Sequence, residues 1–457
     1  MAKINVSRLI AGSKFNAFHW IFFLCCVSVV TVDGYDLVVY GTTIPVLMKT
    51  WAIGPSYAGL IGSYALIGAI SGALVFGPLA DKIGRRKVIA ICTAMFSLAM
   101  ATCGLCNNPV IFGLFRFLAG LGVGGALPNM AALVTEWTPL NKRSVLVSAV
   151  YNGMQVGGIA AAAIGMWLLP VYGWRSVYFC GGVSLLFVPF LLKLVPETPA
   201  LLVARKRNRE LAAALKRVRP EISIPEDAEF EADGKAVTKL PLAQVFQDHR
   251  GFSTVMFWCI YFCTLFGIYG LNIWLPKLMM EAGYALGSSL RFLLTLNLGS
   301  IIGNMIAAAI ADRFGARRTV MFMYLLGFAS VASLSLKTNP YTLTLLVALA
   351  GTCTMGVHNI LQAYVSVYYP PAVRSTGLGF AFGVGRVGSI LGPTLGGLML
   401  SRHFTLFQCF LGFAIPSLIN FAGIVLVRDK HSYAHVAGRM ELDAEELSPA
   451  TETIASQ

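Results

Sequence analysis

Charged side chains are scarce in this sequence. Asp, Glu, Lys and Arg together make up 12% of the 457 residues, whereas a soluble domain carries roughly a quarter. The same chain is 56% hydrophobic and has a mean hydropathy of +0.71. This shortage of charge excludes an ordinary soluble domain and indicates a polytopic membrane protein.

Catalytic and secretory signatures are missing as well. The chain has no phosphate-binding loop, no zinc-ligand spacing and no nucleophile–base pair, which excludes an ATP-driven pump and disfavours an enzyme. We therefore expect no cofactor and no metal. The first apolar segment is too long for a cleavable signal. The ten cysteines lie almost entirely in apolar stretches, and we attribute the redox-like spacing of Cys103 and Cys106 to composition.

Long apolar stretches recur along the chain. Twelve of them are long enough to cross a bilayer. They are Trp20–Thr42, Ala58–Ala80, Val88–Leu105, Val110–Val134, Ser144–Leu168, Ser176–Leu194, Phe252–Trp274, Phe292–Ala311, Thr319–Leu336, Leu343–Val365, Thr376–Leu400 and Leu406–Val427. The sequence predicts an all-α membrane protein with twelve transmembrane helices.

The basic residues are distributed unevenly between the loops. With the N-terminus in the cytoplasm, six Lys and Arg residues fall on the outer side, and the others gather in the cytoplasmic loops. The outer six are Lys49, Arg175, Lys277, Arg291, Lys337 and Arg402. This positive-inside bias places both termini in the cytoplasm of a multi-pass inner-membrane protein. The net charge of +14 thus reflects topology, and we expect no nucleic-acid partner.

The chain repeats itself at one offset of 231 residues. Asp81 falls on Asp312, and the same shift also superposes Pro45 on Pro276, Gly84 on Gly315, Arg86 on Arg317 and Pro139 on Pro370. A constant offset through helices and loops predicts two parallel six-helix halves, 1–194 and 251–428. Paired halves around a central site are a transporter architecture.

Two polar segments lie outside the repeat. Residues 195–250 join the halves, are rich in charge, and read as an amphipathic cytoplasmic helix followed by a flexible connector. Residues 429–457 form a polar, acidic cytoplasmic tail that we expect to be disordered.

Asp33 and Asp36 lie inside the first apolar span. A charge at membrane depth costs at least ~2.5 kcal/mol, so each is expected to face a cavity or a partner. Their i, i+3 spacing places both carboxyl groups on one helix face, where they can share a proton or a cation. The offset of 231 pairs them with Thr264 and Gly267, so only the first half has this acidic pair.

Two arginines lie within spans. Arg116 begins a stripe with Gly120 and Gly124 that suits close helix packing, and it can lie near the aspartates or bond to backbone carbonyls near an interface. Arg386 lies between Gly385 and Gly388, and Gln155 occupies its place in the first half. A guanidinium matches a carboxylate bidentately, so Arg386 is the candidate substrate anchor; a structural ion pair is its alternative.

Other polar and aromatic residues are candidate substrate contacts. These are His358 and Gln362 in the tenth span, Asn272 and Trp274 in the seventh, and Tyr35 in the first. Polar groups in spans also bond neighbouring helices, and aromatic rings also fill cores, so both interpretations stay open for each.

The loop after the second span and its repeat after the eighth contain acids, glycines and arginines together. Glycine permits the tight turn, and an aspartate at a helix end interacts with the helix dipole and with nearby cations. These loops predict a cytoplasmic gate, although arginines there can also serve topology alone. The candidate gate residues are Asp81, Gly84, Arg85, Arg86, Asp312, Arg317 and, at the end of the fourth span, Glu136.

The loop Gly77-Pro-Leu-Ala-Asp-Lys-Ile-Gly-Arg-Arg-Lys87 resembles the signature of the major facilitator superfamily. Within that superfamily, Asp33-Gly-Tyr-Asp36 and the run Gly385-Arg386-Val-Gly388 are similar to the aromatic acid:H⁺ symporter family. Pro196-Glu-Thr-Pro199 resembles a further superfamily motif, with Thr in place of Ser. The stretch Phe15–Trp20 is most similar to the benzoate-transporting branch. One departure is Ala316, at the position of Arg85, and we therefore expect the second gate loop to be held more weakly.

The resemblance implies proton-coupled uptake of an aromatic carboxylate by alternating access. Asp33 and Asp36 would handle the proton, Asp81 the gate and Arg386 the substrate carboxylate, with Arg116 in support. The expected partners are the acid, protons and the lipid bilayer, and the expected state is a monomer.

Five alternatives remain. An efflux antiporter of the same fold typically has a Gly-Pro-Gly-Gly-like motif in the fifth helix, and Asn152–Gly158 lacks proline. A sugar symporter would need several amides and acids rather than one arginine. A symporter of another small organic anion differs only in its cargo. A membrane sensor would bind the acid without transporting it, and a membrane enzyme would be revealed by turnover of the ligand.

Overall fold

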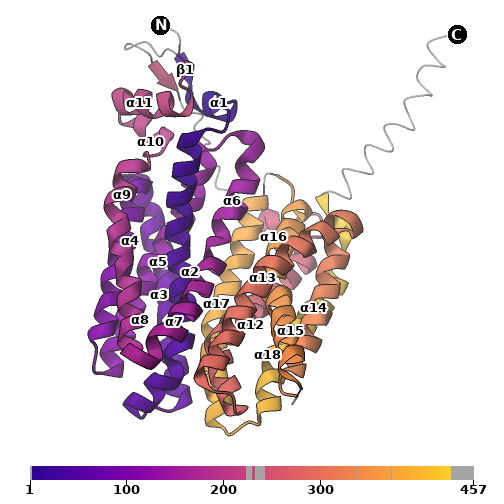
Figure 1. Cartoon of the computed structure of the whole chain (residues 1–457). Coiled ribbons are helices and arrows are strands. Elements are labelled where there is room, and N and C mark those ends of the chain that lie inside the picture. The colour runs from indigo at the N-terminus through magenta and orange to yellow at the C-terminus, as the bar shows by residue number, and fades with distance from the viewer. Residues whose placement is uncertain (1–2, 223–228, 232–241, 337, 372, 434–457) are drawn as a thin grey trace, which may run out of the picture. The chain divides into compact units, whose positions relative to one another are not determined.

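The computed structural model describes residues 3–222, 229–231, 242–336, 338–371 and 373–433 (Figure 1). Residues 434–457 of the predicted tail lie outside this described part, as do 223–228 and 232–241 of the predicted connector. The described elements are helical except for two short strands. In the first part of the chain they are β1 Lys3–Asn5, α1 Val6–Ala11, α2 Ala17–Trp51, α3 Pro55–Ile83, α4 Arg85–Leu105, α5 Pro109–Trp137, η1 Leu140–Lys142, α6 Arg143–Tyr151, α7 Gly153–Tyr172, α8 Trp174–Gly182, η2 Val183–Leu186, α9 Phe187–Leu194, α10 Pro199–Ala204, α11 Asn208–Val218 and β2 Glu229–Glu231.

The second part of the chain continues the pattern of long helices. Its elements are η3 Leu242–Phe246, α12 Gly251–Glu281, α13 Leu286–Phe314, α14 Ala316–Ser333, α15 Pro340–Gly351, η4 Thr352–Gly356, α16 Val357–Tyr368, α17 Arg374–Ser401, α18 Leu406–Leu426 and η5 Asp429–His431. The turn η4 is a wide π turn that joins α15 to α16 within one continuous span.

Eleven of the described helical segments are long and apolar enough to cross a membrane. The predicted ninth span corresponds to α14, which is not among the eleven. Two arginines near its start lower the mean hydropathy of this short helix below that of the eleven spans. The all-α membrane fold is confirmed, and eleven of the twelve predicted spans are long and apolar enough to cross a membrane.

The chain divides into two compact units. Unit 1 comprises Met1–Ala236, Asn272–Asn297 and Pro393–Phe404, and unit 2 comprises Val237–Leu271, Leu298–Gly392 and Thr405–Gln457. One end of α12, α13 and α17 therefore groups with the first six predicted spans. The halves read from the 231-residue repeat remain a prediction about the sequence.

Small residues let the helices of unit 1 approach one another closely. A Cβ added at Gly120 or Gly124 of α5 would overlap the backbone of α3 at Ala65 or Ala69. The predicted packing stripe on α5 is thus confirmed. On α2, Gly34 makes a similar approach to the backbone of α7. Because α2 is so tightly surrounded, every residue from Asp33 to Ile44 is buried.

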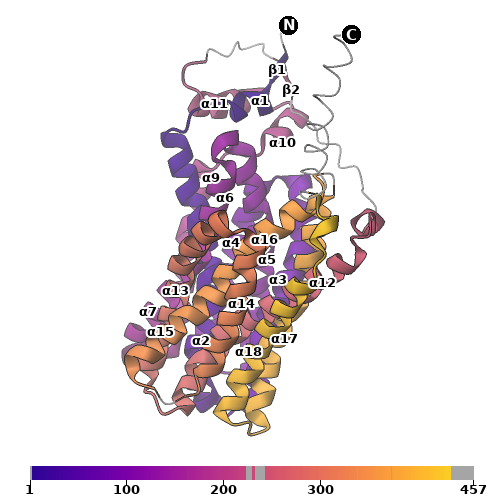
Figure 2. The ribbon, with the colours of Figure 1, turned by 90° about the vertical axis from the view of Figure 1, so that its right-hand side faces the viewer.

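A small cap covers the end of unit 1 that carries the N-terminus (Figures 1 and 2). Strand β1 pairs in parallel with β2, with Ile4 opposite Phe230. Helix α11 is amphipathic: it buries Leu211 and Leu215 in the core of the unit and exposes its basic side chains. The predicted amphipathic helix is confirmed, whereas three-residue strands carry too little pattern to be predicted.

In unit 2, α17 packs against α12 through glycine. A Cβ at Gly385 or Gly388 would press on the backbone of α12 at Tyr261 or Phe262, so these glycines let the two helices approach closely around Arg386. Figure 2 shows α14 running beside α18. Between these helices and α12, the Thr264 and Tyr324 hydroxyls lie 2.8 Å apart, and the amide of Asn420 donates to Thr264 at 3.0 Å.

Candidate functional site

Asp36 forms a buried ion pair with Arg116. The guanidinium of Arg116, on α5, donates to the carboxylate of Asp36, on α2, and also reaches the Asp36 carbonyl at 3.4 Å. Arg116 is 2% exposed and Asp36 is 5% exposed, so neither charge is solvated. Removing one partner of such a pair leaves an uncompensated charge and costs ~3–5 kcal/mol.

Aromatic and sulfur groups complete the surroundings of Arg116. Its guanidinium lies 5.4 Å from the ring centre of Tyr40 and 3.8 Å from the sulfur of Met100. Tyr40 is itself fixed, because its hydroxyl donates to the carbonyl of Ala58. The pair is therefore held from α2, α4 and α5 at once, and this geometry favours one orientation of the two charges.

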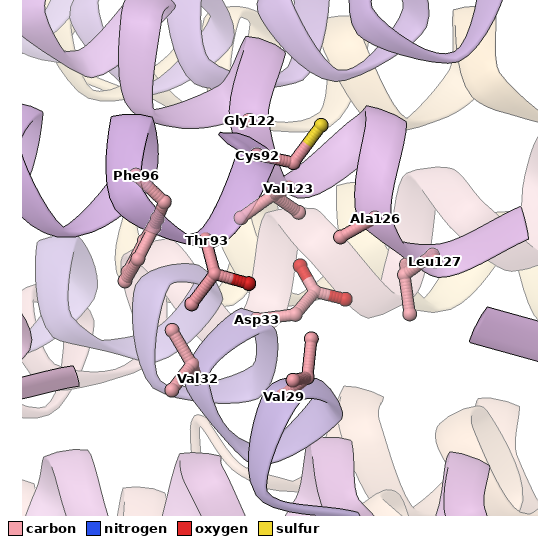
Figure 3. A pocket seen from close by; sticks show the side chains of 10 residues that line it. All are labelled: Val29, Val32, Asp33, Cys92, Thr93, Phe96, Gly122, Val123, Ala126 and Leu127. Carbon is pink, nitrogen blue, oxygen red and sulfur yellow. The ribbon is translucent and has the colours of Figure 1, made fainter. Parts of the chain in front are cut away.

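Asp33 has different surroundings from Asp36. Its side chain points into a small cavity between α2, α4 and α5 (Figure 3). The cavity has a volume of ≈ 10 Å³, about the room of one water molecule. Its lining is almost entirely apolar and consists of Val29, Val32, Cys92, Thr93, Phe96, Gly122, Val123, Ala126 and Leu127, besides Asp33.

The aspartates therefore form two sites rather than one. One helix turn separates them, but Asp36 meets a cation and Asp33 meets an apolar cavity. The sequence suggested that they share a proton or a cation on one face. In the structure Arg116 forms an ion pair with Asp36, and the sharing of a proton between the two aspartates remains a prediction.

Tyr35, a predicted substrate contact, uses its hydroxyl inside unit 1. The group donates to the carbonyl of Val177 at 2.6 Å, and the side chain is buried. On the next turns of α2, the hydroxyls of Thr43 and Tyr178 lie 2.9 Å apart. These bonds anchor α2 to α8, and the role of Tyr35 as a substrate contact remains a prediction.

Arg386 lies in unit 2, where it is half-buried on α17. It donates to the hydroxyl of Tyr269, on α12, at 3.4 Å. No acidic side chain forms an ion pair with Arg386 among the described residues. The alternative of a structural ion pair therefore finds no partner within the described part of the chain.

His358 lies in an aromatic group near Arg386. Its ring centre is 5.6 Å from that of Tyr261 and 5.3 Å from that of Phe382. Arg386 interacts with it electrostatically. Gln362 follows one turn later on α16 and is half-buried. Unit 2 thus gathers a cation, an imidazole and aromatic walls from α12, α16 and α17.

Asn272 and Trp274 belong to unit 1 instead. The indole of Trp274 donates to the carbonyl of Pro393 at 2.8 Å, and the amide of Asn297 donates to Asn272 at 3.3 Å. Both predicted residues are completely buried. They hold together the ends of α12, α13 and α17, and their role as substrate contacts remains a prediction.

Three acidic side chains hold the predicted gate loop of unit 1 in place. Arg85 pairs with Glu136 at 2.8 Å. The neighbouring residue Arg86 donates its backbone N–H to the carboxylate of Glu197 at 3.2 Å, and its side chain pairs with Glu210 on α11 at 3.5 Å. Glu197 is 1% exposed and lies at the N-terminal end of α4, where a negative charge is stabilised by the helix dipole.

The corresponding loop of unit 2 uses one acid. Arg317 pairs with Asp429 at 2.7 Å and donates to the carbonyls of Ile424 and Val427. The hydroxyl of Tyr364 donates to the same carboxylate at 2.6 Å. Arg317 therefore fastens the start of α14 to the end of α18.

Asp81 and Asp312, at the ends of α3 and α13, are exposed, and neither takes part in an ion pair among the described residues. The glycines that follow behave as the predicted turn requires. Gly84 has φ 108° and Gly315 has φ 88°, a region that disfavours other residues. A Cβ at Gly84 would also overlap the carboxylate of Glu197.

At the Trp51 end of α2, unit 1 contains a further set of polar contacts. The hydroxyl of Ser56, on α3, donates to that of Ser401, on α17, at 2.7 Å. Two turns along α3, the hydroxyls of Ser63 and Thr394 also lie 2.7 Å apart. Gly59, between them, approaches the carbonyl of Pro393 closely. These contacts join α3 to α17.

Sequence reasoning missed Glu197, Asp429, Tyr261 and the pairs made by Ser56 and Ser63. Glu197 had a signal, because it lies in the Pro-Glu-Thr-Pro motif, and Asp429 is an acid directly after the last span. Serine and tyrosine inside apolar spans carry no such signal, since their partners lie far away in the sequence.

Comparisons with known proteins show what the whole chain is similar to. The Major Facilitator Superfamily profile matches residues 24–303 and 287–455. A benzoate transport protein of Acinetobacter baylyi is 41% identical over 438 residues, which is 94% of each chain. A gallate transporter of Pseudomonas putida is 31% identical over 93% of each chain.

A solved structure is similar in fold. The crystal structure of a D-xylose-proton symporter superposes with a TM-score of 0.71, and the match covers 90% of this chain and 97% of the other. The sequence identity is 17%, so this likeness concerns the fold alone.

Proposed function

This chain belongs to the major facilitator superfamily, and we propose that it is a proton-coupled symporter that takes up an aromatic carboxylic acid, benzoate or a hydroxybenzoate. It is a multi-pass membrane transporter rather than an enzyme. We assign it to the inner membrane with both termini in the cytoplasm. The observation that carries the proposal is the separation of charge: buried acids in unit 1, and a cation among aromatic rings in unit 2.

Arg386 is the proposed carboxylate anchor. Its donors are engaged by one tyrosine hydroxyl at 3.4 Å, which is a weak bond that an anion can replace. The rings of Tyr269 and Phe382 supply flat apolar surface for an aromatic ring. The relatives named as benzoate and gallate transporters support this class of substrate.

Asp33 is the proposed site of the transported proton, and Asp36 is a charge held by Arg116. The cavity beside Asp33 is apolar, and a neutral carboxyl group suits it better than an anion. Asp36 instead has a permanent counter-charge within bonding distance. Protonation of Asp33 would thus place a neutral carboxyl group beside this apolar cavity.

Energy favours coupling to protons. An anion that enters a negative interior works against ~2.3 kcal/mol per 100 mV. One accompanying proton cancels that electrical cost and leaves the pH gradient, worth ~1.4 kcal/mol per pH unit. A second proton would make uptake electrogenic.

Alternating access then requires contacts that break on one side while others form. We assign the pairs Ser56–Ser401 and Ser63–Thr394 to the outer gate, since they join α3 to α17 at the end that the positive-inside bias places outside. The Arg85–Glu136 and Arg86–Glu197 contacts lie at the cytoplasmic end of the same unit.

The test is uptake of radiolabelled benzoate into proteoliposomes under an imposed inward proton gradient, with and without an uncoupler. Accumulation that the uncoupler abolishes is the expected result. Export of preloaded benzoate when the gradient runs the opposite way, without uptake, would replace symport by efflux. Binding of benzoate with no flux in either direction would indicate a sensor.

A further inference from the structure

Three rings of unit 2 form a cluster one helix turn from Arg386. Tyr261 comes from α12, His358 from α16 and Phe382 from α17. Their ring centres are 5.0 to 5.6 Å apart in every pairing. Residues 382 and 386 are separated by one turn of α17, ~5.4 Å along its axis. That spacing is comparable to the length of a benzene ring.

Two polar atoms in this cluster are buried without a hydrogen bond. They are the hydroxyl oxygen of Tyr261 and Nδ1 of His358, and neither finds a partner in the part of the chain that the structure describes. Buried polar atoms in native proteins nearly always have one. Tyr261 is completely buried, so solvent does not compensate for the missing bond.

Other tyrosines of unit 2 provide a contrast. Tyr324 bonds with Thr264, Tyr364 with Asp429, and Tyr369 with Thr254. The core of the unit therefore satisfies tyrosine hydroxyls where they serve packing alone. Tyr261 differs from them by lying beside the proposed carboxylate anchor.

The internal repeat gives independent support. At the offset of 231 residues, Tyr261 and His358 correspond to Val30 and Leu127 of unit 1. Both counterparts are buried apolar side chains, so the helix packing shared by the repeats does not require polar groups there. A π turn, η4, also comes directly before α16 and ends one residue before Val357, next to His358. Such turns often occur at functional sites.

We propose that Tyr261 and His358 form a subsite for a hydroxyl group on the ring of the transported acid. This inference rests on the proposed function. With the carboxylate on Arg386, the ring of the acid extends along α17 toward Phe382. A hydroxyl group on the far side of that ring then reaches the Tyr261 hydroxyl and His358 Nδ1, which otherwise have no hydrogen-bond partner. A phenolic hydroxyl both donates and accepts, which matches the tyrosine O–H and a neutral imidazole nitrogen. The subsite makes the carrier prefer hydroxybenzoates over benzoate.

The test compares two tyrosine variants in one unit. Tyr261→Phe removes the open hydroxyl, and the matched control Tyr324→Phe removes a hydroxyl that is bonded to Thr264. Unlabelled benzoate, 3-hydroxybenzoate and 4-hydroxybenzoate compete with radiolabelled benzoate for uptake. In Tyr261→Phe, we expect the better hydroxybenzoate to lose about tenfold in apparent affinity, equivalent to ~1.4 kcal/mol. Benzoate itself should change less than about twofold, since it makes no such bond. Tyr324→Phe should leave the ratio between the acids unchanged.

A second variant guards against misfolding. His358→Phe retains an aromatic ring and removes the imidazole nitrogen atoms. It should lower the apparent affinity for hydroxybenzoate relative to that for benzoate. Unchanged ratios in both Tyr261→Phe and His358→Phe would overturn the subsite. If the wild-type protein does not take up benzoate, the proposed function fails instead. The subsite is then judged by titrating the same acids into the purified full-length protein, where loss of the hydroxybenzoate preference in Tyr261→Phe supports it and an unchanged preference overturns it.

Discussion

Arg86 in unit 1 and Arg317 in unit 2 lie 231 positions apart. Arg86 contacts the segment that follows the sixth predicted span, and Arg317 contacts the segment that follows the twelfth. Arg86 meets Glu197, and Arg317 meets Asp429. A second correspondence is closer still. The indole of Trp137 donates to the carbonyl of Glu197 at 3.2 Å, and the hydroxyl of Tyr368 donates to the carbonyl of Arg428 at 3.2 Å. Both donors and both acceptors are related by the same offset.

The contacts at the helix ends are alike in the two units, but the buried residues in the interiors of the units differ. Asp33 corresponds to Thr264, and Thr93 corresponds to Tyr324. In unit 2 the longer tyrosine reaches the threonine and bonds with it at 2.8 Å. In unit 1 the shorter Thr93 side chain leaves the small cavity into which Asp33 points.

The difference shows which parts of the repeat serve the fold. Contacts at the helix ends have the same geometry with different side chains, an indole in one unit and a phenol in the other. The buried positions have lost their correspondence in chemistry: acids and Arg116 occur in unit 1, and Arg386 occurs in unit 2. Four changes test this division.

The largest effect should come from fixing the proposed outer gate. Ser56→Cys with Ser401→Cys places two thiols where hydroxyls lie 2.7 Å apart. Oxidation should then abolish uptake almost completely, and reduction should restore it, because a transporter joined at one gate cannot alternate. Radiolabelled benzoate uptake before and after oxidation measures this.

A matched pair within the first predicted half serves as the control. The hydroxyls of Ser97 and Ser184 lie 2.6 Å apart, on α4 and η2. Ser97→Cys with Ser184→Cys should transport normally when oxidised. The chain has ten native cysteines, so each single-cysteine variant is also required. Full uptake by the oxidised Ser56–Ser401 pair would remove it from the gate.

The next effect concerns the cation found only in unit 2. Arg386→Gln gives unit 2 the side chain that unit 1 has at Gln155. Loss of one partner of a desolvated charge pair costs 2–5 kcal/mol, so the KM for benzoate should rise roughly 100-fold. Arg402→Gln, an exposed cation just beyond the same helix, should leave uptake unchanged. An unaltered KM in Arg386→Gln would move the carboxylate site elsewhere.

The two aspartates should fail in different ways. Asp33→Asn should fold normally and exchange benzoate across the membrane, yet lose accumulation driven by the proton gradient. Asp36→Asn should also lower stability by ~3–5 kcal/mol, because Arg116 stays buried without a counter-charge. Thermal melting and counterflow assays separate these outcomes. Asp36→Asn with Arg116→Gln should recover part of the stability, and equal behaviour of both single variants would argue for one shared site.

Much of this arrangement could be predicted from the sequence. Apolar runs located the spans, and one constant offset revealed the repeat. The acids and arginines within spans stood out because a buried charge is costly. The sequence did not show which aspartate Arg116 contacts, since i, i+3 spacing leaves both within reach. Nor did it reveal Tyr261, whose special feature is a missing partner, and partners are set by contacts between distant helices.

The smallest effect should come from making the gate loops alike. Arg85→Ala copies Ala316 into unit 1 and breaks the ion pair with Glu136, whose members are 23% and 30% exposed. Partial solvation limits the loss to about 1 kcal/mol, and the melting temperature should fall by ~2–4 °C with uptake within about twofold. Ala316→Arg should not raise the melting temperature, since Val367 occupies the position that corresponds to Glu136. Lys87→Ala removes an exposed side chain from the loop of Arg85 and should change neither the melting temperature nor uptake. Thermal melting of the three variants measures this, and complete loss of uptake in Arg85→Ala would show that the ion pair controls gating as well as stability.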